Sequence, residues 1–317
     1  MLRYLAGRVA TMVLVLLAIS LGLFALSHSA PGGPLASLIP IDQVGDSQAL
    51  IEAKTKEFGL DKPLPVQYWL WLSHLLVGDL GTSFQYSRPV AHLIMERMVP
   101  TLELMGLGLL IGNLVAVALG LYQASKKGKP IDYALGAVSL VLLSTPAFFL
   151  GMLAIFLFSA VLGWLPSSQM TTAGDGSTLD LIRHLILPVG VLATVHSAGI
   201  TRYVRAGLLE EVSRDYVRTA IAKGATMRQA RWKAFRNALG PIVTVMMMGV
   251  PALLSGAVVL EAVFSWPGLG SLTLDAISFR DYPVILGFGM MVSVVVVLSN
   301  LVSDLLLTVL DPRVALR

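Results

Sequence analysis

Six long apolar stretches dominate the pattern of hydrophobic and polar positions along the chain. A helix needs roughly 20 mostly apolar residues to cross a hydrocarbon core about 30 Å thick. The fourth stretch is the weakest, because Pro188 lies inside it and His196 lies near its end. The pattern predicts an all-α integral membrane protein with six transmembrane helices. The predicted helices cover residues 9–27, 102–122, 135–157, 185–200, 242–263 and 284–310.

The first apolar stretch permits a second interpretation. Residues 1–30 combine basic residues, an apolar run and the small-residue end SHSA, as a signal peptide does. The apolar run of about 19 residues is longer than the roughly 7–15 of a signal peptide. We therefore expect residues 1–30 to form an uncleaved N-terminal transmembrane helix, with cleavage as the alternative.

The composition agrees with a lipid environment. The 317 residues are 56% hydrophobic and 13% charged, with a mean hydropathy of +0.78, whereas about 25% of a soluble domain is charged. The chain has no cysteine, which excludes disulfides, thiolate metal sites and cysteine nucleophiles. We expect a multi-pass membrane protein, in contact with lipid and without nucleic acid as a partner.

Lysine and arginine are divided unequally between the two sides of the predicted helices. Sixteen of the 23 lie on the side of the N-terminus, nine of them between Arg202 and Arg236, and seven lie on the opposite side. Five of those seven occupy one long loop, where positive charge has less influence on orientation. The positive-inside rule therefore predicts that both termini and the loop 202–241 are cytoplasmic.

Residues 31–100 form the predicted extracytoplasmic segment. It opens with turn-forming residues, continues as a predicted helix over 46–58, and then reads PVQYWLWLSHLLVGDLG. Tyr68, Trp69 and Trp71 cluster in this last part, and such rings favour membrane interfaces. The stretch predicts a short interfacial helix, and it can also be a docking surface for an extracytoplasmic partner.

One basic segment differs from the chain around it. The stretch DYVRTAIAKGATMRQARWKAFRNALGP, residues 215–241, holds six cations and one acid, Asp215. Tyr216, Val217 and Ala220 share one stripe of a predicted helix. Gly224 interrupts the pattern, as a glycine just past a helix end does. We expect a first short helix that ends at this glycine.

A second short helix is predicted directly afterwards. Thr226, followed three residues later by Gln229, has the spacing of a capping box. Small apolar residues then recur at helical spacing until Gly240-Pro241, which predicts the end of the helix. Three interpretations of the pair remain open on spacing alone: a basic loop that sets topology, an amphipathic pair on anionic lipid, and an element that docks on a protein.

The basic segment resembles the cytoplasmic loop of ABC importer permeases. The usual form of that loop is EAA, a glycine four residues later, and an ending of a hydrophobic residue, Leu and Pro. Arg218-Thr219-Ala220 stands where EAA would stand, with Gly224 as the glycine and Pro241 as the proline. Arg218 and Thr219 depart from the usual form, and a glycine replaces the usual leucine before Pro241.

The form DYVRTAxAKG…RNALxP is similar to the branch that serves dipeptide, oligopeptide and nickel uptake, and other segments agree. They are LRYLAGRVATMVLVLLAISLGLFAL, FGLDKPLPVQYWLWL…GDLGTSF, EAVFSWPGLGSLTLDAISFRDYPV and the closing DPR, so the resemblance extends from residue 2 to 313. It is closest to the first, B-type, permease subunit. The resemblance implies the ABC type I importer permease (MetI-like) fold, with residues 101–317 as a core of five transmembrane helices and the coupling loop 202–241.

The resemblance also implies a location in the plasma (inner) membrane, and it implies the partners. They are a second, C-type permease, two ATPase subunits or domains, and an extracytoplasmic solute-binding protein that delivers di- or oligopeptides. The chain itself has no G-x-x-x-x-G-K-[ST] loop, so ATP and Mg²⁺ are expected on the ATPases, and no cofactor on this chain. We expect no catalytic residues and no metal site. The expected ATPase-coupling residues are Asp215, Tyr216, Val217, Arg218, Ala220, Gly224 and Pro241.

A second candidate region follows the fifth predicted helix. In FSWPGLG, residues 264–270, one proline and two glycines indicate a non-helical stretch that could gate the outer cavity. The candidate gate or path residues are Glu261, Trp266, Pro267 and Gly268. For Glu261 the alternative is a hydrogen bond between helices.

Other solutes and another class of transporter remain as alternatives. Nickel, glutathione or another small solute could replace the peptide in an importer of this type. An ion-coupled secondary transporter is the rival class, although the sequence shows no clear internal repeat of the kind such folds contain.

Overall fold

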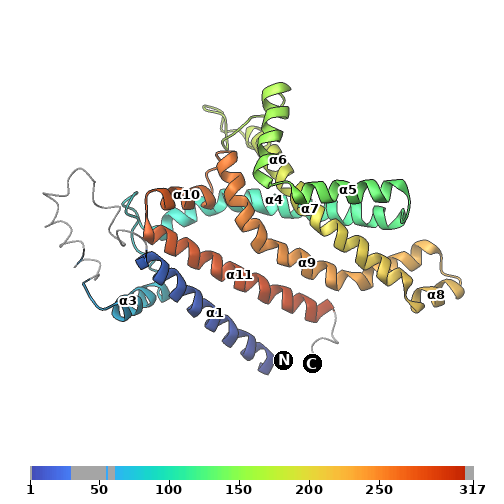
Figure 1. Ribbon diagram of the computed structural model, residues 1–317, viewed down its shortest axis with the longest axis horizontal. Helices are drawn as coiled ribbons and strands as arrows, with labels where there is room; N and C mark the ends of the chain where they lie inside the picture. The colour runs from blue at the N-terminus through green and yellow to red at the C-terminus, as the bar shows by residue number, and fades with distance from the viewer. Residues whose placement is uncertain (1, 30–54, 56–60, 311–317) are drawn as a thin grey trace. The chain divides into compact units, whose positions relative to one another are not determined.

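The structure is a computed structural model that describes residues 2–29, 55 and 61–310. Its regular elements are helices, and contacts between residues divide the chain into two compact units (Figure 1). One unit contains residues 1–99 and 268–297, and the other contains residues 100–267 and 298–317. Apart from residue 55, the helix predicted over 46–58 lies outside the described residues.

The first unit contains α1 (Leu2–Ser29), α3 (Leu64–Leu76), α10 (Leu269–Ser278) and part of α11 (Tyr282–Leu310). The helix predicted around the aromatic cluster is confirmed as α3, and it packs on α1. The hydroxyl groups of Tyr68 and Ser20 lie 2.9 Å apart, and the rings of Tyr68 and Trp71 contact Phe24. Trp69 points away and is 67% exposed, so α3 keeps one aromatic side free. Its position at a membrane interface stays a prediction.

Asp281 organises the loop that precedes α4 (Val90–Ser125) in the first unit. Its carboxylate, which is fully buried, accepts hydrogen bonds from the Ser83 hydroxyl at 2.5 Å and from the backbone N–H groups of Phe84 and Gln85 at 3.2 and 3.1 Å. Three donors compensate for the desolvation of the carboxylate. The loop therefore has a defined shape although it contains no regular helix.

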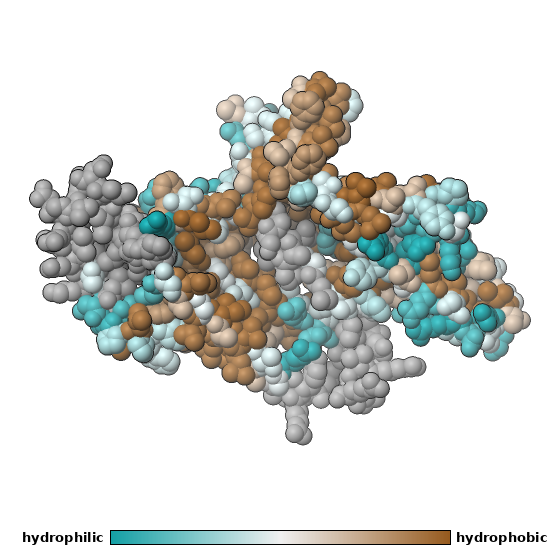
Figure 2. Space-filling view, viewed as in Figure 1, coloured by the Kyte–Doolittle hydropathy of each residue, from teal (hydrophilic) through white to brown (hydrophobic). Residues whose placement is uncertain are grey.

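The second unit contains the rest of α4, the helices α5 (Pro130–Ser144) and α6 (Ala147–Ala154), and the π-helix η2 (Ile155–Val161). It also contains α7 (Thr178–Ser213), α8 (Asp215–Ala222) and α9 (Met227–Val263). α7 packs along α9 and also contacts α5 and α6. In Figure 2, hydrophilic residues gather over the turn between α4 and α5 and over α8, whereas α6 and η2 present hydrophobic surface.

Small residues on α4 allow it to approach α7 closely. A Cβ atom added at Gly120 would lie 2.6 Å from Val204, and one added at Gly112 would lie 2.9 Å from the ring of His196. The His196 Nε2 atom lies 3.0 Å from the amide oxygen of Asn113, so α4 and α7 are also joined by a hydrogen bond. Close approach at glycine and hydrogen bonds between helices are the usual means of association in lipid.

The third predicted transmembrane helix, 135–157, is wrong as a single straight helix. α5 and α6 are separated by a break at Thr145-Pro146 and bend by 102°. Thr145 is extended, with φ −92° and ψ 126°, because the ring of a following proline disfavours the helical conformation of the residue before it. The apolar run predicted a membrane segment, but it did not reveal the bend.

Four helices in the described residues are long and apolar enough to cross a membrane, or five if α5 with α6 and η2 is one broken span. They include the first predicted helix, within Gly7–Ser29, and those of α4, α7 and α11. The stretch predicted over 242–263 lies within α9. The all-helical membrane fold is confirmed, while the count of six and the cytoplasmic position of both termini stay predictions.

Candidate functional site

The basic segment forms a sharp reversal of the chain between α7 and α9. α8 begins at Asp215, after Arg214 in an extended conformation, and the chain turns back at Gly224. Figure 1 shows α8 at the end of the α7–α9 pair. We refer to residues 214–229, which contain α8, the turn and the first residues of α9, as the elbow.

One side of α8 is anchored in the protein itself. Val217 is 3% exposed and packs in a cluster with Leu208 of α7 and with Ala234 and Phe235 of α9. The Tyr216 hydroxyl donates a hydrogen bond to Glu211 at 2.7 Å. Burial raises the pKa of Tyr216, and the hydrogen bond to the carboxylate of Glu211 raises it further. Both residues were expected among those that couple to an ATPase, and this role stays a prediction; the structure buries Val217 within the protein itself.

The other side of α8 is free for contact. Arg218, Thr219 and Ala222 are exposed, and Ile221 beside them is 39% exposed, so an apolar side chain lies within a polar surface. Arg218 and Asp215 approach to 4.0 Å, but ion pairs between exposed side chains contribute only about 0–1 kcal/mol. These residues could therefore be rearranged at little cost when another surface approaches.

Two local motifs define the turn of the elbow. Gly224 has φ +93°, its N–H bonds the carbonyl of Ile221 at 2.9 Å, and the N–H of Ala225 bonds the carbonyl of Ala220 at 3.0 Å. This pair of bonds is a Schellman motif, in which glycine takes the left-handed conformation without a steric penalty. The helix end predicted at Gly224 is therefore confirmed, and two hydrogen bonds fix it.

The capping box predicted at the start of α9 is confirmed. The Thr226 hydroxyl accepts a hydrogen bond from the backbone N–H of Gln229 at 3.3 Å, and the Gln229 side chain accepts one from the N–H of Thr226 at 2.9 Å. The two bonds satisfy donors that would otherwise lack partners at the helix end. α9 thus begins at a defined residue directly after the turn.

The predicted end of the second helix at Gly240-Pro241 is wrong. α9 continues for 37 residues from Met227 to Val263, so Pro241 lies inside it. Pro241 is exposed, and its neighbour Ile242 is 2% exposed. Proline is tolerated within membrane helices because the carbonyl it frees can find other partners. At about 1.5 Å per residue, the elbow therefore leads into a continuous helix that measures about 55 Å along its axis.

An ion pair between a buried carboxylate and a partly exposed arginine escaped sequence analysis. Arg205 of α7 bonds both carboxylate oxygens of Asp132, in the first turn of α5, at 2.7 Å each. Asp132 is 3% exposed and also accepts the N–H of Gly128 at 3.0 Å, and the Gln123 side chain bonds its backbone carbonyl at 2.8 Å. A bidentate arginine–carboxylate pair is among the strongest polar contacts in proteins. It joins the start of α5 and the turn after α4 to α7.

The second candidate region is tightly packed. Glu261 is fully buried and accepts a hydrogen bond from the Thr101 hydroxyl at 2.6 Å. Trp266 is also fully buried, and its indole N–H donates to the carbonyl of Pro100 at 2.9 Å. Residues 264–268 are non-helical, as predicted, but Leu269 and Gly270 of the predicted stretch belong to α10, whose N-cap is Gly268. Packed side chains rather than a solvated path surround Glu261 and Trp266, which agrees with the alternative of a bond between helices.

Long apolar helices and an exposed charged elbow are typical of an integral membrane protein. Residues 116–316 match the family described as "Binding-protein-dependent transport system inner membrane component", and residues 1–105 match the corresponding N-terminal family. The chain belongs to this family, which comprises permease subunits of ABC importers. It is an inner-membrane permease and not an enzyme, and ATP hydrolysis takes place in separate subunits.

Curated relatives cover nearly the whole chain. The oligopeptide transport system permease protein AppB of Bacillus subtilis is 37% identical over 318 residues, and a peptide permease protein of Brucella suis biovar 1 is 40% identical over 317 residues. The dipeptide transport system permease protein DppB of Escherichia coli K12 is 35% identical over 337 residues. In all three cases the match covers 99% of both chains.

A solved structure supports the predicted fold class. The MetNI methionine ABC transporter in inward-facing conformations matches with a TM-score of 0.54 at 17% identity, over 69% of this chain and 96% of that chain. At this identity the likeness concerns the fold alone. The MetI-like permease fold that the sequence predicted is confirmed.

Proposed function

We propose that this chain is the B-type permease of an ATP-driven importer of di- and oligopeptides. The full-length similarity to permeases named for oligopeptide and dipeptide transport carries the proposal. In this arrangement a C-type permease completes the translocation path, two ATPase subunits or domains bind ATP and Mg²⁺, and an extracytoplasmic solute-binding protein delivers the peptide. This chain contributes half of the path and one elbow.

The elbow is the proposed contact with an ATPase. Its exposed side combines Arg218 and Thr219 with the apolar Ile221, while Val217 anchors the opposite side in the protein. A partner that pushes on α8 therefore pushes on the ends of α7 and α9, because the Schellman motif and the capping box leave little freedom between the helices. Of the residues expected to couple, Val217 and Tyr216 act by anchoring α8, and Asp215, Arg218 and Ala220 lie at or near the contact.

The Trp266 turn, which we define as residues 261–267, is proposed as a closed end of the path. Glu261 and Trp266 hold this turn against residues 100 and 101 of α4. If a path opened here, the hydrogen bonds of Glu261 and Trp266 would have to break and be replaced by others. Pro267 and Gly268, in the non-helical stretch, are the residues at which the chain could bend.

Replacement of Ile221 by glutamate tests the elbow contact. The matched control is Ile131→Glu in α5, because both isoleucines are 39% exposed and lie on segments predicted to be cytoplasmic. We expect Ile221→Glu to reduce the ATPase subunits that co-purify with the chain by about tenfold or more, since a charge would be desolvated at the contact. Ile131→Glu should leave co-purification unchanged. Equal retention in both variants would place the ATPase contact elsewhere.

Uptake of a labelled tripeptide tests the substrate class. Cells that lack this chain should lose uptake, and the intact chain should restore it. Loss of nickel uptake with peptide uptake intact would favour the alternative solute. Uptake that persists when the ATPases are inactivated would favour an ion-coupled carrier.

A further inference from the structure

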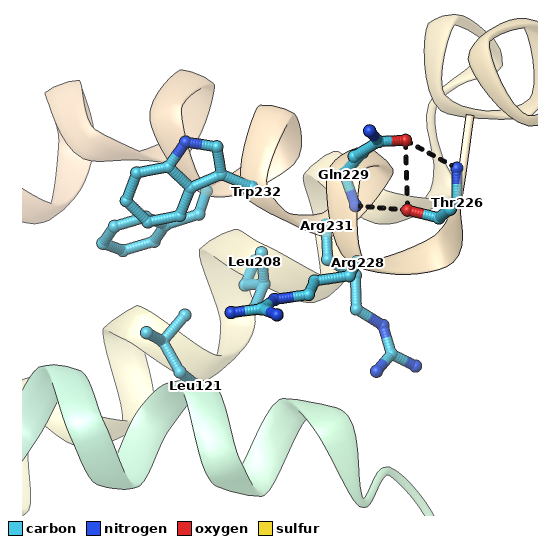
Figure 3. A pocket seen from close by; sticks show the side chains of 8 residues that line it. Leu121, Leu208, Thr226, Arg228, Gln229, Arg231 and Trp232 are labelled. Atoms are coloured by element: carbon cyan, nitrogen blue, oxygen red, sulfur yellow. Dashed lines mark hydrogen bonds between the residues drawn. The ribbon is translucent and has the colours of Figure 1, made fainter.

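A groove of about 760 Å³ opens beside the elbow, within the second unit. Figure 3 shows Trp232 at one end of the groove and the hydrogen-bonded Thr226 and Gln229 at the other, with Leu121 of α4 and Leu208 of α7 facing α9. The groove is thus apolar along its floor and polar along its rim. Its lining residues are Leu121, Leu208, Thr226, Arg228, Gln229, Arg231, Trp232 and Phe235.

The groove lies at the level where a membrane helix ends. Leu121 belongs to the last turns of α4, which is long and apolar enough to cross a membrane. Lys126, directly after this helix, lies 5.8 Å from the centre of the Tyr122 ring. Trp232 is 60% exposed across the groove. An exposed tryptophan and a cation over an aromatic ring at the end of an apolar helix are typical of the boundary between lipid and water.

Two arginines on the rim have no acidic partner in the part of the chain that the structure describes. Arg228 and Arg231 are exposed and form no ion pair there, whereas Arg205 and Arg214 each bond carboxylates. The capping box already uses the backbone N–H of Gln229. The guanidinium groups are therefore the donors that remain for an anion at this end of the groove.

We propose that the groove binds an anionic phospholipid of the cytoplasmic leaflet. An acyl chain would lie along Leu121, Leu208 and Phe235, and the phosphate of the headgroup would meet Arg228 and Arg231. Basic pockets between membrane helices on the cytoplasmic side suit such headgroups. The observations favour lipid over an ATPase surface, because the apolar floor belongs to α4 and α7 at the membrane boundary, whereas the exposed side of α8 lies outside the groove lining.

The bound lipid would stabilise the start of α9 from the side of the membrane. Arg228 lies within the capping box and Arg231 follows it by two residues, so a headgroup held by both would fix the angle at which α9 leaves the elbow. Anionic lipid would then favour the packing of the elbow on α7 and α4. This role is independent of which solute the transporter carries.

The test uses the assembled transporter, purified in detergent and titrated with phosphatidylglycerol or with phosphatidylcholine. Bound lipid is counted by native mass spectrometry. We expect at least one phosphatidylglycerol to bind in preference to phosphatidylcholine. Loss of a cation near anionic lipid weakens binding by about fivefold, so Arg228→Gln combined with Arg231→Gln should weaken the preferred site by about 25-fold.

A second pair of cations on the same helix supplies the control. Lys233 and Arg236 are exposed on α9 but do not line the groove. Lys233→Gln combined with Arg236→Gln removes the same charge and should leave the preferred site within about twofold. Trp232→Ala should weaken binding of both lipids, because it removes apolar contact without a change in charge.

Four outcomes would overturn the proposal. Three of them are equal binding of the two lipids by the wild type, an equal loss in both double variants, and a loss of ATPase subunits from the Arg228/Arg231 variant with lipid binding intact. The last outcome would assign the groove to a protein partner. Competition by glycerol phosphate as strong as that by phosphatidylglycerol would also overturn it, because the apolar floor would then contribute nothing.

Discussion

The two ends of α9 are held in different ways. At its start, the elbow is shaped by hydrogen bonds between residues close in sequence, such as Thr226 with Gln229 and Gly224 with Ile221. At its end, the Trp266 turn depends on Thr101 and Pro100, which are more than 150 residues away along the chain. Most of the elbow except Val217 is exposed, whereas Glu261, Phe264 and Trp266 of the Trp266 turn are buried.

This difference suits different tasks. Local hydrogen bonds let the elbow keep its shape while its outer side meets another surface. Contacts over a long sequence separation hold the Trp266 turn in place only while α4 and α9 stay together. A motion that separates these helices would therefore disturb the Trp266 turn before it disturbs the elbow.

The strongest test of the comparison is Trp266→Ala. Removal of a buried tryptophan leaves a cavity and costs about 3–5 kcal/mol, so the apparent thermal unfolding midpoint in detergent should fall sharply. Trp164→Ala is the control, because Trp164 is 68% exposed. Trp266→Phe keeps most of the volume and should cost about 1–3 kcal/mol, as the carbonyl of Pro100 loses its donor. A fall no larger than that of the control would show that the turn is not fixed by this contact.

Arg205→Leu asks whether the elbow end also depends on a distant contact. This variant leaves the carboxylate of Asp132 buried without its cation, which should lower the free energy of unfolding by about 3 kcal/mol. Asp132→Asn in the same chain should restore part of the loss, because the buried charge is then removed. The measurement is the thermal midpoint of each single variant and of the double variant. If the losses of the two single variants add up in the double variant, Arg205 and Asp132 are not a coupled pair.

Gly224→Ala tests the local turn. A left-handed conformation costs an alanine about 1–2 kcal/mol, and the strain falls directly on the elbow. Gly174→Ala is the matched control, since Gly174 has φ +85°, Gly224 has φ +93°, and both have open space around the Cβ position. We expect the two variants to have similar thermal midpoints and only Gly224→Ala to lose peptide uptake. Equal peptide uptake by Gly224→Ala and Gly174→Ala would show that Gly224 has no role in coupling.

The contribution of Tyr216 to the stability of the elbow should be the smallest of those tested, and it should depend on pH. Its pKa is raised from 10.0 by burial and by the bond to Glu211, so the neutral phenol favours the folded elbow. This contribution is present below about pH 10 and is lost as the pH rises through the higher pKa of the folded state. Hydrogen exchange of α8, measured relative to the intrinsic base-catalysed rate at each pH, should therefore accelerate above about pH 10 in the wild type.

Tyr216→Phe should abolish that acceleration. It should also raise the exchange rate at neutral pH slightly, since loss of one hydrogen bond costs about 0.5–1.5 kcal/mol. Tyr203→Phe serves as a control, because Tyr203 is 59% exposed. The same dependence on pH in wild type and Tyr216→Phe would assign the effect to another group.

The sequence by itself determined the features that depend on neighbours along the chain. Apolar length predicted the membrane helices within α1, α4, α7 and α11, Gly224 predicted the end of α8, and Thr226 with Gln229 predicted the start of α9. The resemblance in the basic segment and beyond indicated the permease family. These predictions succeeded because a cap or a turn is decided within a few residues.

Only the tertiary structure decided which surfaces are free and which polar groups meet. Val217 fits the stripe of a docking helix, yet the packing of α7 and α9 buries it. Gly240-Pro241 signals a helix end, yet neighbouring helices support α9 through it. Asp132 with Arg205, and Trp266 with Pro100, are separated by 73 and 166 residues. No local pattern records such pairs, because they exist only once helices have packed and each buried polar group needs a partner.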